Sequence, residues 1–108
     1  MSALATAPDR IRRYAPTVDT FLPCLGEEEK RLRCGILYMR DKATAASRHA
    51  RREPELILST ITTIATEHAF AAMPIEHIRE LHAGLVRLMM VAIALETRGP
   101  GSSLDEPE

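Results

Sequence analysis

Apolar residues recur at helical spacing through residues 74–97, and this pattern restricts the fold more than any other feature of the chain. The positions, separated alternately by three and four residues, are Ile78, Leu81, Leu85, Leu88, Ala92 and Leu95. Pro74 suits the first turn of a helix, and the segment "RGPG" at 98–101 suits its end. The pattern therefore predicts a helix over 74–97 with one continuous face in a core.

The same helix carries more apolar residues than one core face needs. The stretch "GLVRLMMVAIALE" at 84–96 holds a single charge, Arg87, before its closing glutamate. A helix that is apolar nearly all round must be covered on every side, which two neighbouring helices cannot do. Either the N-terminal arm folds over the remaining surface, or another chain does. We expect a homodimer or partner interface formed by Ile78, Leu81, Leu85, Val86, Leu88, Met89 and Ile93.

Two further helices are predicted before this one. The first begins near Gly26 with three glutamates in its first turn and is stopped by Pro54. Its apolar stripe consists of Leu32, Ile36, Met39, Ala43, Ala46 and Ala50. The second starts at Pro54 and keeps helical spacing through Ile57, Ile61 and Ile64, although its β-branched residues would also suit a strand. We predict an all-α fold, a three-helix antiparallel bundle that dimerises through its C-terminal helix.

The 108 residues form one domain with two dissimilar ends. Residues 1–25 contain three prolines and predict an irregular N-terminal arm, with helical turns near 9–14 and 17–22. Residues 26–97 form the helical domain. Residues 98–108, ending in "SSLDEPE", predict a disordered acidic tail.

The composition of the chain indicates its cellular compartment. The net charge is −1, no secretory signal opens the sequence, and no apolar run approaches the roughly 20 residues that cross a bilayer. We therefore expect a cytoplasmic protein with no membrane partner. Cys24 and Cys34 are then expected as reduced thiols, with a disulfide between them as the alternative.

The titratable residues do not form a recognisable catalytic or metal-binding motif. His77 and Glu80 are spaced for one helix face, but His77 and His82 point about 140° apart at 100° per residue. His68 lies on an otherwise apolar line and is best explained by a hydrogen bond to a neighbouring group. We expect no metal, no cofactor and no enzymatic activity.

A basic cluster gives a second hypothesis for function. Arg48, Arg51 and Arg52 lie at the C-terminal end of the first predicted helix, and Arg40 and Lys42 precede them. Arg10, Arg12 and Arg13 could add to this patch. It suits nucleic-acid phosphates or an acidic protein surface. The chain has neither Asn nor Gln, and no aromatic residue is interleaved with this run for base readout, so nucleic acid is the less favoured partner.

The C-terminal segment "PIEHIRELHAGLVRLMMVAIALE" also carries a family resemblance. A small helical chain rich in alanine and arginine, with such a final helix, resembles the anti-activators of bacterial quorum sensing. Those proteins bind LuxR-type transcription factors and block their dimerisation or DNA binding. The resemblance covers residues 27–97 in shape and composition and transfers no functional residue. It implies a cytoplasmic bacterial dimer that regulates transcription by occupying a transcription factor's own interface.

Overall fold

The computed structural model describes residues 9–105, with side chains described for residues 9–97. The described chain is all-helical and contains no strand, which confirms the all-α part of the predicted fold. Besides one helical turn at 9–12, it holds four helices: α2 (Ala15–Phe21), α3 (Glu27–Ser47), α4 (Arg52–His68) and α5 (Ile75–Asp105).

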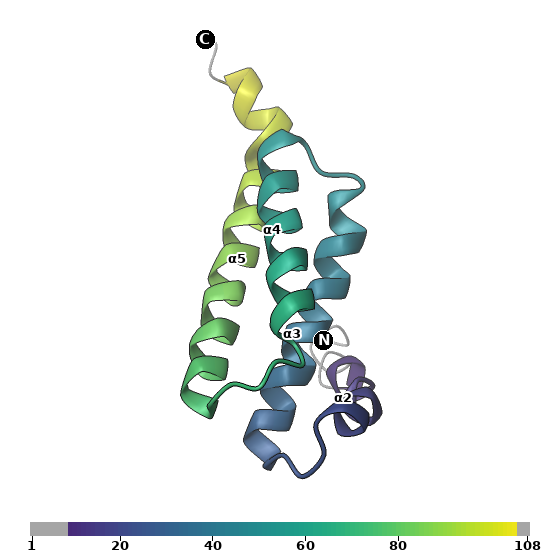
Figure 1. Cartoon of the computed structure of the whole chain (residues 1–108). Helices are drawn as coiled ribbons and strands as arrows, with labels where there is room; N and C mark the ends of the chain where they lie inside the picture. The colour runs from purple at the N-terminus through teal and green to yellow at the C-terminus, as the bar shows by residue number, and fades with distance from the viewer. Residues whose placement is uncertain (1–8, 106–108) are drawn as a thin grey trace.

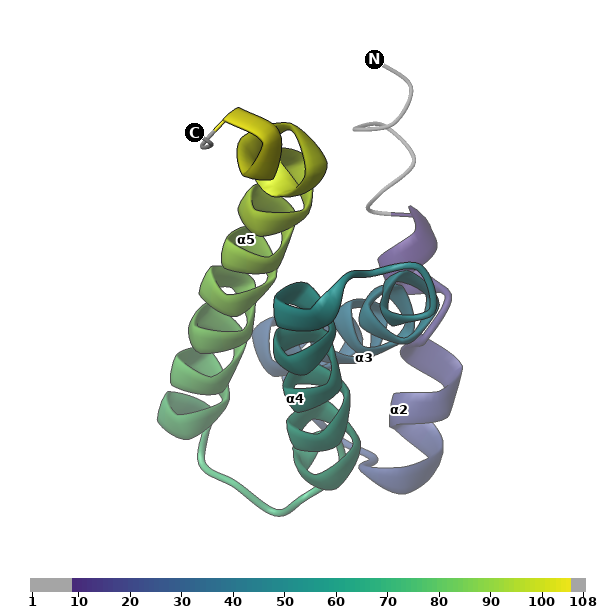
Figure 2. The ribbon, with the colours of Figure 1, turned by 90° about the horizontal axis from the view of Figure 1, so that it is seen from above.

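The three long helices pack against one another in every pairing, and α4 runs opposite to α3 and α5 (Figure 1). Both nitrogens Nε and Nη2 of Arg79 on α5 lie 2.9 Å from the carboxylate of Glu28, so α3 and α5 begin at the same end of the molecule. The short helix α2 packs on α3, on the far side from α5 (Figure 2). Helix α3 therefore contacts each of the other three helices.

Two predicted helix ends are wrong. The first long helix ends at Ser47 rather than at Pro54, and Pro54 lies in the first turn of α4, where a missing N–H costs nothing. Helix α5 continues to Asp105, through the segment expected to start a disordered tail. Pro100 lies within this helix, although an interior proline lacks one backbone donor and disfavours the helical conformation. Residues 106–108 of the predicted tail lie outside the described residues.

The core follows the apolar stripe predicted for α5. Ile78, Leu85 and Ala92 are buried, and Leu81 and Leu88 are half-buried beside them. In α4 the prediction was partly wrong, because the buried positions are Pro54, Leu58, Ile61 and Ala65, whereas Ile57 and Ile64 are half-buried. Because α4 contacts both α3 and α5, its buried side differs from the side that carries Ile57 and Ile64.

The buried core also contains a charge, Arg33, which the sequence did not identify. Only 1% of Arg33 is exposed. Its Nη1 donates to the carbonyl oxygens of Ala69 and Ala71 at 3.0 Å each, and its Nε donates to Glu29 Oε2 at 2.9 Å. The guanidinium thus satisfies carbonyl groups just beyond the negative end of α4. It ties α3 to the connection between α4 and α5.

A glycine allows α3 and α5 to approach closely. A Cβ atom at Gly35 would lie 2.8 Å from Nε2 of His82, nearer than such atoms can come. Gly35 lies in the middle of α3, where glycine costs about 1 kcal/mol relative to alanine. The contact with the His82 ring explains why the helix carries glycine at this position.

The N-terminal arm is more ordered than predicted over its described part. Its helix α2 places Val18 in the core, fully buried, and covers the side of α3 that carries Cys34. At 100° per residue Cys34 lies about 160° from Ile36, a position that favours an outward side chain. The residue is nevertheless 2% exposed, because α2 packs on α3 with Asp19 near the thiol. An arm that supplies core residues is an integral part of the helical domain.

The two cysteines should react at very different rates. Both are free; Cys24 is exposed in a left-handed conformation (φ 68°), and burial raises the pKa of the Cys34 thiol. Because the thiolate is the reactive form, we expect one equivalent of Ellman's reagent to react quickly with the folded chain and the second only in denaturant. Cys24→Ser should abolish the fast phase. Equal rates for both thiols would contradict the packing of α2 on α3.

Candidate functional site

Large apolar side chains remain exposed on α5 after the chain has folded. Met90, Val91 and Ile93 expose 63%, 47% and 58% of their surface, and we call these three the α5 outer face. The described part of the N-terminal arm lies on α3 instead, on the other side of the molecule (Figure 2). The interpretation in which the arm covers this helix therefore does not hold for residues 9–25.

The structure divides the seven predicted interface residues into three groups. Ile78 and Leu85 are at most 1% exposed and belong to the chain's own core, so their assignment to an interface is corrected. The half-buried residues, which pack on the core from its edge, are Leu81, Val86, Leu88 and Met89. Ile93 alone of the seven is exposed. A periodic stripe includes both core and surface positions, because periodicity does not show where the neighbouring helices lie.

Met90 and Val91 were not among the seven predicted interface residues, and their exposure makes them the better interface candidates. The signal that identifies them is their place outside the 3–4 stripe of α5. A residue that is apolar yet off the core stripe is the one left for a partner once the stripe is buried.

Two grooves run between α4 and α5. The first has a volume of about 410 Å³ and is lined mainly by apolar side chains, among them Ile64, Leu88 and Val91. The second, of about 550 Å³, lies where α4 begins and is lined by Pro54, Leu56 and Leu95 together with charged residues. The first groove thus extends the α5 outer face toward α4 through Val91.

The predicted basic patch is exposed but not assembled into one site. Arg48, Arg51 and Arg52 are all exposed. Arg51 and Arg52 line the larger α4–α5 groove beside Glu53 and Glu96, whereas Arg48 does not line it. Two carboxylates beside two guanidinium groups leave little net positive charge in that groove.

A different set of cations comes together between the arm and α3. A groove of about 350 Å³, which we call the cationic groove, is lined by Arg10, Arg13, Tyr14, Tyr38, Asp41 and Lys42. The Nζ atom of Lys42 lies 5.7 Å from the centre of the Tyr38 ring, within the range of a cation–π contact. Arg10 and Arg13 were predicted as possible additions to the basic run, whereas the two tyrosines that lie among these cations were not predicted.

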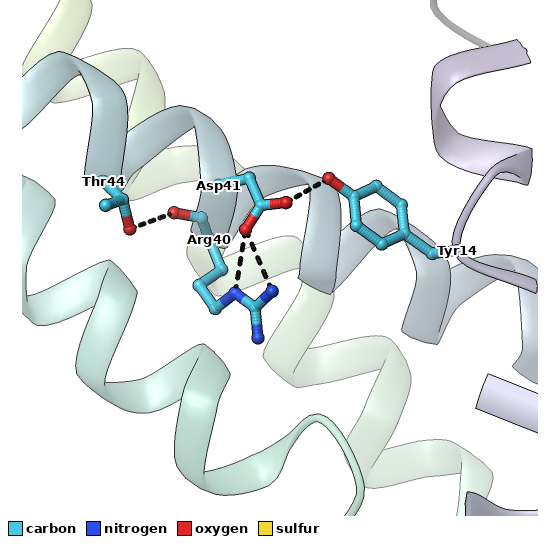
Figure 3. Close-up of polar contacts among 4 residues, drawn as sticks. All are labelled: Tyr14, Arg40, Asp41 and Thr44. Atoms are coloured by element: carbon cyan, nitrogen blue, oxygen red, sulfur yellow. Dashed lines mark hydrogen bonds and ion pairs between the residues drawn. The ribbon is translucent and has the colours of Figure 1, made fainter. Parts of the chain in front are cut away.

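A hydrogen-bond network holds the arm at this groove. The Tyr14 hydroxyl donates to Asp41 Oδ2, and Arg40 donates to Asp41 Oδ1 from Nε at 3.0 Å and from Nη2 at 2.9 Å (Figure 3). The Thr44 hydroxyl donates to the carbonyl oxygen of Arg40 one turn further along α3. Among the described residues, Asp41 is thus one of two α3 residues that join the arm by a polar contact; the other is Lys30, whose Nζ lies 3.0 Å from Asp19 Oδ1.

The contact between Tyr14 and Asp41 predicts a loss of stability at alkaline pH. Burial, followed by the hydrogen bond to Asp41 and its charge, raises the pKa of Tyr14 to about 12 from the ordinary value of 10.0. The folded chain thus holds this proton more tightly than the unfolded chain. The stabilisation is complete below pH 10 and is lost as the pH rises from 10 toward 12.

Urea unfolding measured across that pH interval checks this. Tyr14→Phe should show a smaller decline in the free energy of unfolding, because it lacks the titrating group. Tyr38→Phe should show the same decline as the wild type. An identical decline in the wild type and in Tyr14→Phe would show that other groups cause it.

The histidines considered in the sequence are dispersed. His77 is exposed on α5, His68 donates from Nδ1 to the carbonyl oxygen of Ile64 at 3.0 Å, and desolvation lowers the pKa of His82 beside Gly35. Among the described residues, no three His, Cys, Asp or Glu side chains gather in a way that would hold a metal ion.

None of the described helices has the length and apolar character to cross a bilayer. A scan against protein-family models, a search of curated proteins and a search of solved structures each gave no match. Function is therefore inferred from the geometry of the chain alone.

Proposed function

We propose that this protein is a non-enzymatic regulator that acts by binding another protein through the α5 outer face. The observation that carries the proposal is the exposure of Met90, Val91 and Ile93 on one helix. Exposed apolar patches on folded chains mark surfaces that meet a partner, since leaving them in water is costly. Methionine suits such a surface because its flexible side chain adapts to an imperfectly matched partner.

In the absence of its target, the same face would pair with a second copy. A two-fold axis passing between Met90 and Val91 would bring Met90 of each chain against Val91 of the other in an antiparallel contact of the two α5 helices. Arg87, the one charge within the apolar stretch, would then lie opposite Ala94 rather than opposite itself. A homodimer of three-helix bundles joined through α5 would cover the apolar surface without burying like charges against each other.

The resemblance to quorum-sensing anti-activators supplies a specific form of this proposal. A bacterial cytoplasmic protein of that kind would exchange its own dimer contact for the dimerisation surface of a transcription factor. The apolar α4–α5 groove, lined by Ile64, Leu88 and Val91, would widen the contact beside α5. Transcription would be regulated because the target could no longer dimerise or bind DNA.

The experiment compares wild type with Met90→Glu and Ile93→Glu, using Thr63→Glu as a matched control. Thr63 is exposed on α4, so this control adds the same charge to a helix surface away from α5. Light scattering should give a dimer mass for wild type and control and a monomer mass for the two α5 variants, because each places a charge in an apolar contact.

The target is sought by pull-down from the host lysate, with nuclease treatment and high-salt washes. A protein retained by wild type and control but lost with both α5 variants supports the proposal, whether the free chain is a monomer or a dimer. A monomeric wild type whose captured proteins are unchanged by Met90→Glu and Ile93→Glu would refute it.

A further inference from the structure

We propose that the cationic groove is a binding site for a phosphate group. Its cations come from two parts of the chain, since Arg10 and Arg13 belong to the N-terminal arm and Lys42 to α3. The groove lies on the side of α3 that packs with the arm, away from α5. The proposed site is therefore independent of the α5 outer face.

The single carboxylate in the groove is already neutralised. Asp41 accepts hydrogen bonds from the Tyr14 hydroxyl and from two nitrogens of Arg40. This leaves the charges of Arg10, Arg13 and Lys42 available to a ligand. Among residues 9–97, no carboxylate forms an ion pair with any of these three side chains.

Three uncompensated cations favour a phosphate over a carboxylate ligand. A carboxylate carries one negative charge, whereas a phosphate monoester carries nearly two at neutral pH and offers three acceptor oxygens. Two guanidinium groups and one ammonium group provide donors in the geometries that phosphate oxygens accept. The volume of about 350 Å³ is at the lower end of the range of small-ligand sites.

The aromatic side chains give the groove its fixed framework. Tyr14 is held in place by Asp41, and the Tyr38 ring holds Lys42 above its face through the 5.7 Å contact. Tyr38 is half-buried on the rigid helix α3. Lys42 is therefore positioned before a ligand arrives, which reduces the entropy lost on binding.

Isothermal titration calorimetry with four probes tests the site: inorganic phosphate, adenosine 5′-monophosphate, adenosine, and a short thymidylate oligonucleotide. The variants are Arg13→Gln and Lys42→Gln, with Arg87→Gln on α5 as a control that removes the same charge elsewhere. All of these positions are exposed, so circular dichroism should show an unchanged fold.

We expect at least one phosphate-bearing probe to bind and adenosine not to bind. Each groove variant should weaken binding about tenfold or more, the usual effect of losing one charge-assisted hydrogen bond, and Arg87→Gln should have no effect. Tighter binding of the monophosphate indicates a nucleotide ligand, and tighter binding of the oligonucleotide indicates a nucleic-acid backbone.

Three results would overturn the proposal. The first is that none of the phosphate-bearing probes binds at millimolar concentration. The second is that adenosine binds as well as its monophosphate, which would assign the affinity to the base and sugar. The third is that Arg13→Gln and Lys42→Gln leave binding unchanged, which would place the phosphate elsewhere on the chain.

Discussion

Arg33→Ala is expected to lower the free energy of unfolding by about 3–5 kcal/mol, the typical cost of breaking a buried ionic contact. The side chain is 1% exposed and donates to Ala69 O, Ala71 O and Glu29. Its removal leaves two carbonyl groups and a carboxylate without their donor. The loss is a large share of the 5–15 kcal/mol that stabilises a domain of this kind.

Urea unfolding followed by circular dichroism measures this change. Arg31→Ala is the matched control, because Arg31 is exposed on the same helix and its removal should change the free energy by no more than about 0.5 kcal/mol. The loss of unfolding free energy in Arg33→Lys should lie between the losses in Arg31→Ala and Arg33→Ala. An ammonium keeps the charge but lacks the planar guanidinium that reaches several acceptors. A loss below about 1 kcal/mol in Arg33→Ala would mean that water donates to the Ala69 and Ala71 carbonyl groups in place of the guanidinium.

Leu85→Glu is expected to unfold the chain, whereas Met90→Glu leaves it folded. Leu85 is 1% exposed and Met90 is 63% exposed on the same helix. At Leu85 the substitution loses about 3–5 kcal/mol of apolar packing and adds the cost of burying a carboxylate. At Met90 it should change the stability of the single chain by about 0.5 kcal/mol or less.

Thermal melts of the two variants at several protein concentrations check this contrast. A loss in Met90→Glu that grows with protein concentration would report a dimer that stabilises the wild type by mass action. A cooperative melt of Leu85→Glu near the wild-type temperature would contradict the burial of Leu85. Leu85 therefore cannot be used to test a partner interface, and Met90 can.

The local sequence patterns were sufficient to predict that the long helices form. The 3–4 spacing of apolar residues from Ile78 to Leu95 predicted both α5 and its core side, and the glutamates after Gly26 marked the start of α3. These features depend on residues within one or two turns of each other. Their consequences for the backbone are the same whatever packs on the helix afterwards.

The failed predictions of which side chains are buried share one cause. Cys34 is buried because α2 packs on it, and Arg33 is buried because the carbonyl groups after α4 accept its hydrogen bonds. Helix α4 buries Leu58 rather than Ile57 because it contacts two other helices at once. Each outcome depends on residues far apart in the sequence, which helical periodicity does not relate.

The same distinction between local sequence pattern and tertiary packing applies to the two candidate sites. The sequence alone shows that α5 has an excess of apolar residues. Neighbouring helices cannot cover all of this apolar surface, so some of it must be exposed. Which residues these are, Met90, Val91 and Ile93 rather than Leu85, depends on where α3 and α4 lie. The cationic groove exists only once the arm has folded back onto α3 and Tyr14 has reached Asp41, 27 residues away. Helix formation is a local property of the chain, whereas burial and the meeting of distant side chains are properties of its packing.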